Sequence, residues 1–240
     1  KFENILKLNQ DFIIGVSGGS DSLALCFLSK IYSIKKSYNA YYYIVDHRLR
    51  KNSSAEAQLV KKLLKKYNIK SDILKWYGKK PISNIQSLAR NKRYSLLINQ
   101  AKKLNIKTIL TGHHIDDLYE NFFIRISRGS GLNGLVSFGK KTQRDKINIL
   151  RPLISFEKEH LNYVSTKVFK SYIDDPSNED NKFKRVRIRK LLKNLQNDGL
   201  DKNKFLLTIK NLTDSNETIK FYVAKNLKDN SFIYKDKSKI

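Results

Sequence analysis

Cysteine is almost absent from this 240-residue sequence, which contains only Cys26. A single cysteine cannot form an internal disulfide, so disulfide-stabilised folds and cysteine-rich zinc sites are excluded. Long apolar runs are missing as well, because none approaches the roughly 20 residues that a membrane-spanning helix needs. The N-terminus has neither the apolar stretch nor the small-residue cleavage site of a signal peptide. We therefore expect a cytoplasmic protein that does not enter a membrane.

Acidic residues are also scarce, with 22 Asp and Glu against 48 Lys and Arg, which gives a formal net charge of +26. Such an excess favours a polyanionic partner such as nucleic acid. Lysine-rich composition supplies part of the charge as a general background, whereas the scarcer arginines are grouped. The groups are Arg48 and Arg50, Arg90 and Arg93, Arg125 and Arg128, Arg151, and Arg185, Arg187 and Arg189. Grouped arginines suit bidentate contacts with phosphates or carboxylates.

Hydrophobic periodicity predicts that strands and helices alternate. Strands are expected at Phe12–Val16, Tyr41–Val45, Ile73–Tyr77 and Thr108–Thr111, and helices over Asp21–Lys30, Ser54–Lys66, Ile85–Leu104 and Ile115–Arg128. Ser53 and Glu56 have the spacing of a capping box. The alternation predicts an α/β fold, in which a parallel twisted sheet carries helices on both faces. Ligands of such folds bind beyond the carboxyl ends of the strands.

The alternation of strands and helices becomes less regular after Arg128. Loops are expected at residues 129–139 and 174–181, and the alternation stops after Leu195. Residues Leu200–Leu227 have a helical pattern. We therefore expect one domain over residues 1–196 and a small α-helical appendage over residues 197–240.

The strongest functional signal is the segment Ser17–Ser22, with the sequence SGGSDS, which follows the first strand and opens the first helix. Glycines allow a ligand to approach the backbone closely, and amides, hydroxyls and the helix N-terminus attract an anion. The segment therefore predicts a phosphate site. Asp21 would repel phosphate unless a cation lay between them, which implies Mg²⁺ with Asp21 as its ligand. The alternative is an ordinary glycine-rich turn in which Asp21 complements the helix dipole.

Eight segments, taken in order, resemble the tRNA(Ile)-lysidine synthetases, which are members of the PP-loop ATP-pyrophosphatase superfamily. They are SGGSDS at 17–22, VDHRLR at 45–50, ARNKRY at 89–94, LTGHHIDDLYEN at 110–121, RISRGSGLNGL at 125–135, RPL at 151–153, DDPSN at 174–178 and RVRIR at 185–189. The resemblance covers roughly residues 11–195. The SGG-x-DS motif is typical of the whole superfamily, whereas GHH-x-DD combined with RGSG-L-x-GL is far more specific.

The resemblance implies a Rossmann-like PP-loop nucleotide hydrolase fold and a ligase. The implied enzyme uses ATP to join L-lysine to C2 of the cytidine at the first anticodon position of tRNA(Ile), whose anticodon is CAU. The reaction passes through an adenylated tRNA and gives lysidine, AMP and pyrophosphate. ATP and Mg²⁺ are the implied cofactors, and residues 197–240 become a linker or the start of a C-terminal tRNA-binding domain, in a short or truncated form of the family. The resemblance leaves open whether the protein is a homodimer.

The resemblance also assigns roles to individual residues. Catalytic roles fall to Asp21, Asp46, His113, Asp117 and Glu120. ATP would be bound by Ser17, Gly18, Gly19, Ser20, Asp21, Ser22 and Arg90. L-Lysine would be bound by Asp116, Asp117 and Glu120, and tRNA by Arg128, Arg185, Arg187 and Arg189.

Physical alternatives exist for several of these residues. The three carboxylates have helical spacings that place them on roughly one face, where they can bind a doubly cationic amino acid. They would equally complement the dipole at a helix N-terminus. His113 is expected to contact phosphate or substrate. Arg90 and Arg93 suit ATP or a substrate carboxylate, or surface salt bridges, and the other arginines suit phosphates or a solvated face.

Three positions depart from the family pattern. Gln86 stands where the family usually has Glu, Asn121 where it has Thr, and Val186 where it has Asn. Any role that needs a carboxylate at position 86 is therefore in doubt. Competing functions are a tRNA cytidine thiolase, which usually relies on cysteine pairs, a catalytically silent RNA-binding protein, and an amide-forming ligase that would not need the arginine groups.

Overall fold

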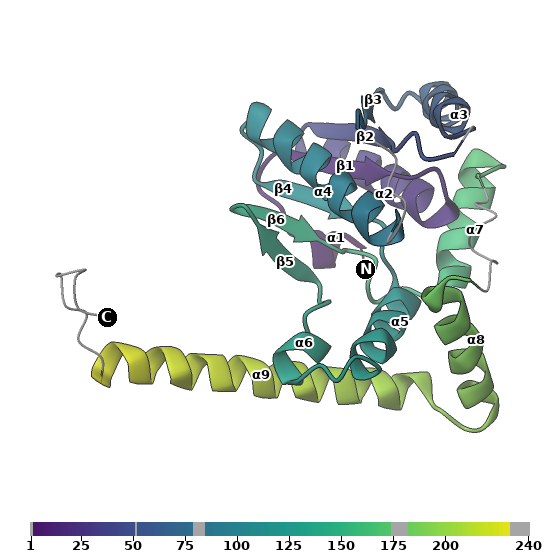
Figure 1. Ribbon diagram of the computed structural model, residues 1–240. Coiled ribbons are helices and arrows are strands. Elements are labelled where there is room, and N and C mark those ends of the chain that lie inside the picture. Colours follow the sequence, from purple (N-terminus) through teal and green to yellow (C-terminus); the bar gives the residue numbers. More distant parts are fainter. Residues whose placement is uncertain (1, 51, 79–84, 174–181, 231–240) are drawn as a thin grey trace.

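The computed structural model describes residues 2–50, 52–78, 85–173 and 182–230. Its centre is a six-stranded sheet in the order β3-β2-β1-β4-β6-β5 (Figure 1). The strands are β1 (Phe12–Val16), β2 (Ala40–Asp46), β3 (Ser71–Lys75), β4 (Thr108–Thr111), β5 (Lys141–Arg144) and β6 (Ile147–Leu150). The helices are α1 (Phe2–Leu6), α2 (Ser20–Lys36), α3 (Ser53–Lys66), α4 (Ile85–Lys103), α5 (Ile115–Ile126), α6 (Leu132–Leu135), α7 (Lys158–Phe169), α8 (Lys184–Asn197) and α9 (Lys202–Asn230).

Strand β1 lies at the centre of the sheet and pairs in parallel with β2 and β4, with Ile13 opposite Tyr41 and Ile109. Strand β6 is parallel to β4, and β5 turns back along β6 in antiparallel register. Because the first four strands and β6 run in one direction, their carboxyl ends meet at one edge of the sheet. The predicted α/β class is confirmed, and among the strands that the structure describes only β5 and β6 pair in antiparallel fashion.

Two apolar layers hold helices on opposite faces of the sheet. Ile14 and Tyr42 belong to a cluster with residues of α1, α2, α3 and α7. Ile13 and Tyr43 belong to a separate cluster with α4. Adjacent strand residues point to opposite faces, so this division follows from the period of two in a strand.

A third cluster joins α5, α6, α8 and the first part of α9 beside the sheet. Phe205 of α9 contacts the rings of Tyr119 and Phe122, with centroids 5.1 and 5.2 Å away. The later turns of α9 extend past α6 and away from the sheet (Figure 1), and their large apolar side chains, such as Phe221, are exposed. The division of the chain near residue 197 stays a prediction.

The four predicted strands and the four predicted helices are confirmed, with ends that shift by one or two residues except in α2, which runs on from Lys30 to Lys36. The predicted capping box is wrong, because Asn52 is the N-cap of α3 and makes no side-chain cap bond. Ser53 Oγ donates to Asp46 instead, at 3.0 Å. The loop predicted at 174–181 lies outside the described residues. Among the helices that the structure describes, none is long and apolar enough to cross a membrane.

Candidate active site

The predicted phosphate loop joins the end of β1 to the start of α2. Gly18 has a φ of +90°, and a Cβ there would lie 2.5 Å from Val60 Cγ2, so the position needs glycine. Ser22 Oγ accepts hydrogen bonds from the amides of Gly18 (3.0 Å) and Ser17 (3.2 Å). It donates to Gly19 O at 2.9 Å, so one hydroxyl fixes the turn. The N-terminus of α2 then faces any ligand above the loop.

Lys158, the first residue of α7, supplies a cation beside this loop. Its Nζ lies 2.7 and 2.8 Å from the two carboxylate oxygens of Asp21 and 2.9 Å from Ser20 Oγ. The ammonium offsets the negative charge that the sequence places among phosphate-binding groups. Lys158 could not be found from the sequence, because it lies 137 positions from Asp21 and no motif surrounds it. Only the packing of α7 on α2 reveals it.

The end of β4 packs directly against the same loop. A Cβ on Gly112 would lie 3.1 Å from backbone atoms of Asp21 and Ser22, so a glycine permits this close approach. The segment that follows β4 therefore begins beside the phosphate loop, as expected when neighbouring parallel strands end at one edge of a sheet.

His114 connects the phosphate loop to the start of α5. Its Nδ1 accepts a hydrogen bond from the Asp116 amide at 3.3 Å, and its own amide donates to Asp117 Oδ2 at 3.0 Å. These reciprocal bonds form a capping box. The other ring nitrogen, Nε2, lies 3.7 Å from Asp21 Oδ2. Phosphate loop and predicted lysine site thus share one imidazole.

His113 lies between β4 and the segment before β5. Its Nδ1 is 2.9 Å from Thr111 Oγ1, and its ring meets Phe138 edge-on with centroids 5.2 Å apart. Burial lowers the pKa of His113 to about 3; the charge of Asp117 acts against burial, and the charges of Arg90, Arg151 and Arg185 act with it. The imidazole is therefore neutral near pH 7, so a contact with phosphate or substrate would be a hydrogen bond and no ion pair.

Glu120, assigned to lysine, is paired with Arg189, assigned to tRNA. Glu120 is 1% exposed, and its Oε1 lies 2.7 Å from both Nε and Nη2 of Arg189. Burial raises the pKa of Glu120, Asp117 raises it further, and Arg189 acts against both. Glu120 Oε2 is buried and has no hydrogen-bond partner among the described residues. The pair connects α8 to α5 and leaves the second carboxylate oxygen without a partner among the described residues.

Asp116 and Asp117 complete the predicted lysine site at the start of α5. Asp116 Oδ1 lies 3.3 Å from Lys202 Nζ of α9. Burial alone would raise the pKa of Asp117, but the neighbouring His113 and His114, the charge of Arg185 and the hydrogen bond from the His114 amide together outweigh burial and lower it. The structure brings the predicted carboxylates to one helix, and two of the three already contact a cation from α8 or α9.

Asp46 occupies the carboxyl end of β2, as predicted, and is 2% exposed. It accepts hydrogen bonds from the Arg48 amide (2.9 Å), Ser53 Oγ (3.0 Å) and Ser54 Oγ (2.6 Å). Burial would raise its pKa, but these bonds outweigh burial and lower it. The carboxylate thus organises the turn into α3, and its contact with nucleotide or metal stays a prediction.

The four arginines assigned to tRNA do not lie together. Arg128 follows α5, and Arg187 lies on α8, and both are exposed. Arg185, also on α8, faces the site closely enough for its charge to lower the pKa of Asp117. Arg189 binds the buried carboxylate described above. Arg128 and Arg187 are thus exposed, whereas Arg185 and Arg189 act on carboxylates of α5.

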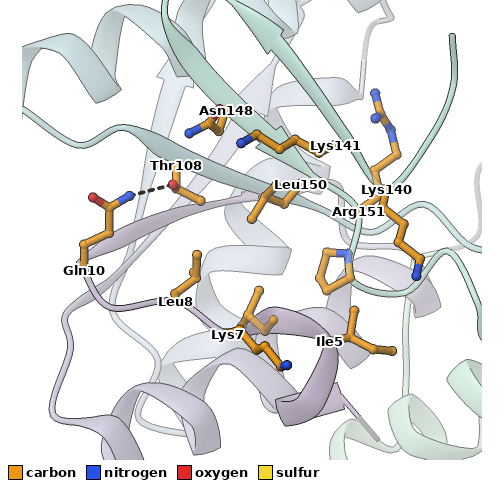
Figure 2. A pocket seen from close by; sticks show the side chains of 12 residues that line it. Ile5, Lys7, Leu8, Gln10, Thr108, Lys140, Lys141, Asn148, Leu150 and Arg151 are labelled. Carbon is orange, nitrogen blue, oxygen red and sulfur yellow. Dashed lines mark hydrogen bonds between the residues drawn. The ribbon is translucent and has the colours of Figure 1, made fainter. Parts of the chain in front are cut away.

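A pocket of about 350 Å³ lies elsewhere, beside α1 (Figure 2). Leucines such as Leu8 and Leu150 line it, Lys7, Lys140 and Lys141 surround it, and Gln10 Nε2 donates to Thr108 Oγ1 at 2.8 Å. Among the described residues that line it, none has a catalytic or binding role assigned from the sequence, and Arg151 is one of them.

A family model described as the PP-loop domain matches residues 1–195. The chain belongs to the PP-loop family. This PP-loop chain is 38% identical over 191 residues to a tRNA(Ile)-lysidine synthase of Rhodopseudomonas palustris, covering 79% of the chain and 55% of the relative. It is 39% identical over 187 residues to that of Orientia tsutsugamushi (78% and 42%) and 32% identical over 234 residues to that of Wolbachia pipientis wMel (95% and 54%). The chain thus spans about half the length of the curated relatives it matches.

Among solved structures, the PP-loop chain is similar to the U34-tRNA thiolase NcsA from Methanococcus maripaludis with its 4Fe-4S cluster. The TM-score is 0.74 with 16% sequence identity, and the match covers 88% of this chain and 74% of that chain. This likeness shows the shared fold.

The expected Mg²⁺ site can be compared with the side chains of the PP-loop chain that could act as metal ligands. Within the described ranges, no group of three or more His, Cys, Asp or Glu side chains could hold a metal ion. Mg²⁺ bound with a nucleotide needs only one or two carboxylates, because phosphate oxygens and water supply the rest. Asp21 fits that requirement when a triphosphate is bound to the loop. In the structure, the Asp21 carboxylate pairs with Lys158.

The departures from the family pattern fall in different environments. Val186 is 6% exposed, so an apolar residue suits its place on α8. Asn121 is half-buried on α5. The side chain of Gln86 and the DDPSN motif at 174–178 lie outside the described residues.

Proposed function

We propose that this chain carries the catalytic domain of a tRNA(Ile)-lysidine synthetase. In that reaction L-lysine is joined to C2 of the cytidine at the first anticodon position of tRNA(Ile), whose anticodon is CAU. The observation that carries the proposal is the contact of His114 with both sites: Nε2 faces Asp21 at 3.7 Å, and the same residue caps the helix of the three carboxylates. A phosphate site and a cation site therefore adjoin, as an ATP-dependent transfer of a cationic amino acid needs. The names of the relatives support this function.

In the first step, the cytosine O2 attacks the α-phosphorus of ATP and pyrophosphate leaves. The loop at residues 17–22 binds the departing phosphates through its amides and the N-terminus of α2. Lys158 stabilises the negative charge that builds on them, and Arg90 adds a second cation near His113. Magnesium, held by Asp21 and the phosphates, supplies further charge neutralisation when bound.

In the second step, the ε-amine of lysine attacks C2, the bond from C2 to the phosphate-bearing oxygen breaks, and AMP leaves while the amine loses a proton. Asp116, Asp117 and Glu120 hold the cationic groups of the amino acid. Both steps require charge stabilisation and orientation, and neither needs a covalent bond to the protein. Asp46 and His113 complete the proposed catalytic set, and Arg128, Arg185, Arg187 and Arg189 the proposed tRNA contacts.

A tRNA thiolase shares the fold, but one observation favours lysine as donor. Cys26, the one cysteine of the sequence, is fully buried, and burial raises the pKa of its thiol. A buried thiol with a raised pKa is a poor nucleophile and sulfur carrier. A catalytically silent RNA-binding protein is disfavoured too. In such a protein the negative charges of Asp21, Asp117 and Glu120 would weaken phosphate binding, and no catalytic role would offset that loss.

The test is mass spectrometry of a tRNA(Ile) transcript with the CAU anticodon after incubation with this chain, ATP, Mg²⁺ and L-lysine. Lysidine should add the mass of lysine less one water, and α-labelled ATP should yield AMP. A methionine tRNA with the same anticodon letters is the control substrate. Release of ADP, or a mass gain without added lysine, would contradict the proposal.

A further inference from the structure

Arginines and aromatic rings alternate beside His113 in a row of contacts that we call the ladder. Arg90 is the one member to which the sequence assigned a role, the binding of ATP. The members of the ladder are Arg144, Tyr94, Arg90, Phe138 and Arg151, and they come from β5, α4, the segment before β5 and the residue after β6. The guanidinium carbon of Arg144 lies 4.8 Å from the centroid of Tyr94, and that of Arg90 lies 5.4 Å from it. Arg90 and Arg151 lie 5.7 and 4.4 Å from the centroid of Phe138.

The two rings of the ladder and Arg151 are buried, whereas Arg90 is half-buried and Arg144 is exposed. Tyr94, Phe138 and Arg151 are 3%, 5% and 4% exposed. Arg151 Nη1 donates to Gly139 O at 2.9 Å, and Nη2 donates to Thr142 Oγ1 at 3.2 Å. Both acceptors are neutral, so they fix the guanidinium in place without cancelling its charge.

The ladder carries a surplus of positive charge. In the part of the chain that the structure describes, no carboxylate forms an ion pair within 4.0 Å of Arg90 or Arg151, and Arg151 Nε has no hydrogen-bond partner. Asp117 is a carboxylate whose charge acts on Arg151 and raises its pKa, and it already serves the cap of α5. Burying like charges together is costly unless an anion joins them.

The position of the ladder relates it to the phosphate loop. Phe138 contacts His113, and the preceding Gly112 packs on Asp21 and Ser22. The ladder therefore lies on one side of the end of β4, and the loop lies on the other. Both places therefore lie next to the carboxyl end of β4, at one edge of the sheet.

We infer that Arg90 and Arg151 form a second phosphate-binding subsite, distinct from the pyrophosphate loop, with Phe138 and Tyr94 as the rings that hold the guanidiniums. The inference rests on the proposed function. The ligand is a phosphate ester of one negative charge, and two sources share that chemistry: the phosphodiester of RNA next to the target cytidine, or the α-phosphate of ATP.

The experiment measures two affinities for the full chain and its variants Arg90→Gln and Arg151→Met. One probe is an RNA stem-loop with the CAU anticodon, and the other is α,β-methylene ATP with Mg²⁺, which resists cleavage at the α-phosphate. Arg125→Met, on the last turn of α5, is the matched control. Loss of one charge-assisted contact should weaken one probe by about 10- to 100-fold and leave the other within about twofold.

Weaker RNA binding with a shallower salt dependence identifies the phosphodiester, whereas weaker nucleotide binding identifies ATP. Both outcomes support the subsite, and Arg90→Lys should recover part of the lost affinity. The subsite is refuted if folded Arg90→Gln binds both probes with unchanged affinity. Should Arg151→Met fail to fold, the result for Arg90→Gln decides the question. The binding arms do not depend on turnover, so a chain that makes no lysidine but shows these losses would refute the proposed function alone.

Discussion

Arg189 of α8 directs two nitrogens, Nε and Nη2, to the same oxygen of the buried Glu120 on α5, each at 2.7 Å. The two residues are 69 positions apart in sequence. The contact joins the C-terminal helices to the site, and it places a cation of the protein where a cationic substrate is proposed to bind. Its removal therefore affects both stability and function.

Replacing Arg189 with Met should lower the free energy of unfolding by about 1–3 kcal/mol at pH 7.5, because it leaves a buried carboxylate without its partner. The lower part of the usual range for buried pairs applies, since the Arg189 side chain is 52% exposed. The deficit should shrink as the pH falls and Glu120 takes up a proton, because a neutral carboxyl no longer needs the cation.

Urea denaturation at several pH values measures this effect. Arg187→Met is the control, since this side chain lies two residues away on the exposed side of α8. A deficit that is equal at pH 5 and pH 7.5 would show that Arg189 stabilises α8 by packing alone.

Removing the cation beside the loop should block the first chemical step. Lys158→Met leaves Asp21 among the phosphates without its partner, and we expect adenylation to slow by about 100- to 1,000-fold, as for other preorganised charge contacts. Lys158→Arg should keep much of the rate. Asp21→Ala should abolish adenylation at every accessible Mg²⁺ concentration. Transfer of label from α-labelled ATP to RNA measures the step, and near-normal transfer in Lys158→Met would remove this residue from the mechanism.

Stability should fall between pH 6.5 and pH 4 because of two histidines. Burial, with help from Arg93, lowers the pKa of His47 to about 4, and burial lowers that of His113 to about 3. In this window the unfolded chain binds more protons than the folded chain, so acid favours unfolding by up to about 1.4 kcal/mol per pH unit for each histidine.

Replacing His113 with Asn should flatten this dependence. His160→Asn, an exposed histidine on α7, is the control. Chemical denaturation at half-unit pH steps measures the slopes, and identical slopes for all three proteins would contradict the assignment to His113.

Local pattern predicted the strand, loop and helix around residues 17–22, and the binding of nucleotide there stays a prediction. A strand, two glycines and a helix fix a loop conformation within ten residues, and Gly18 and Ser22 occupy the places that such a loop requires. The alternation of strands and helices was enough to place His113 and Asp46 at one edge of the sheet, because parallel strands end together.

Contacts between residues that are far apart in the sequence could not be predicted from it. Lys158 and Asp21 meet because α7 packs on α2, and Lys202 meets Asp116 because α9 returns to α5. Charge and motif spacing carry no information about such contacts. The hairpin β5–β6 was missed for another reason, since Lys141–Arg144 is a polar edge strand without an alternating apolar pattern.

The two chemical steps should separate when the carboxylates of α5 are neutralised. Asp117→Asn and Glu120→Gln keep the shape of each side chain and can still accept hydrogen bonds from the His114 amide and from Arg189. The fold should therefore survive. Each variant loses one negative charge toward the amino acid, so the lysine concentration needed for half-maximal transfer should rise about 10- to 100-fold.

Adenylation should persist in both variants, because the phosphate loop and Lys158 are unchanged, so adenylated RNA and pyrophosphate should accumulate at low lysine. Rapid-quench detection of the adenylate together with lysine incorporation measures both steps, with Glu159→Gln, an exposed acid on α7, as the control. High lysine should restore transfer, because the defect lies in binding. If adenylate and lysidine are lost together at every lysine concentration, these carboxylates serve ATP or its metal, and the lysine site must lie elsewhere.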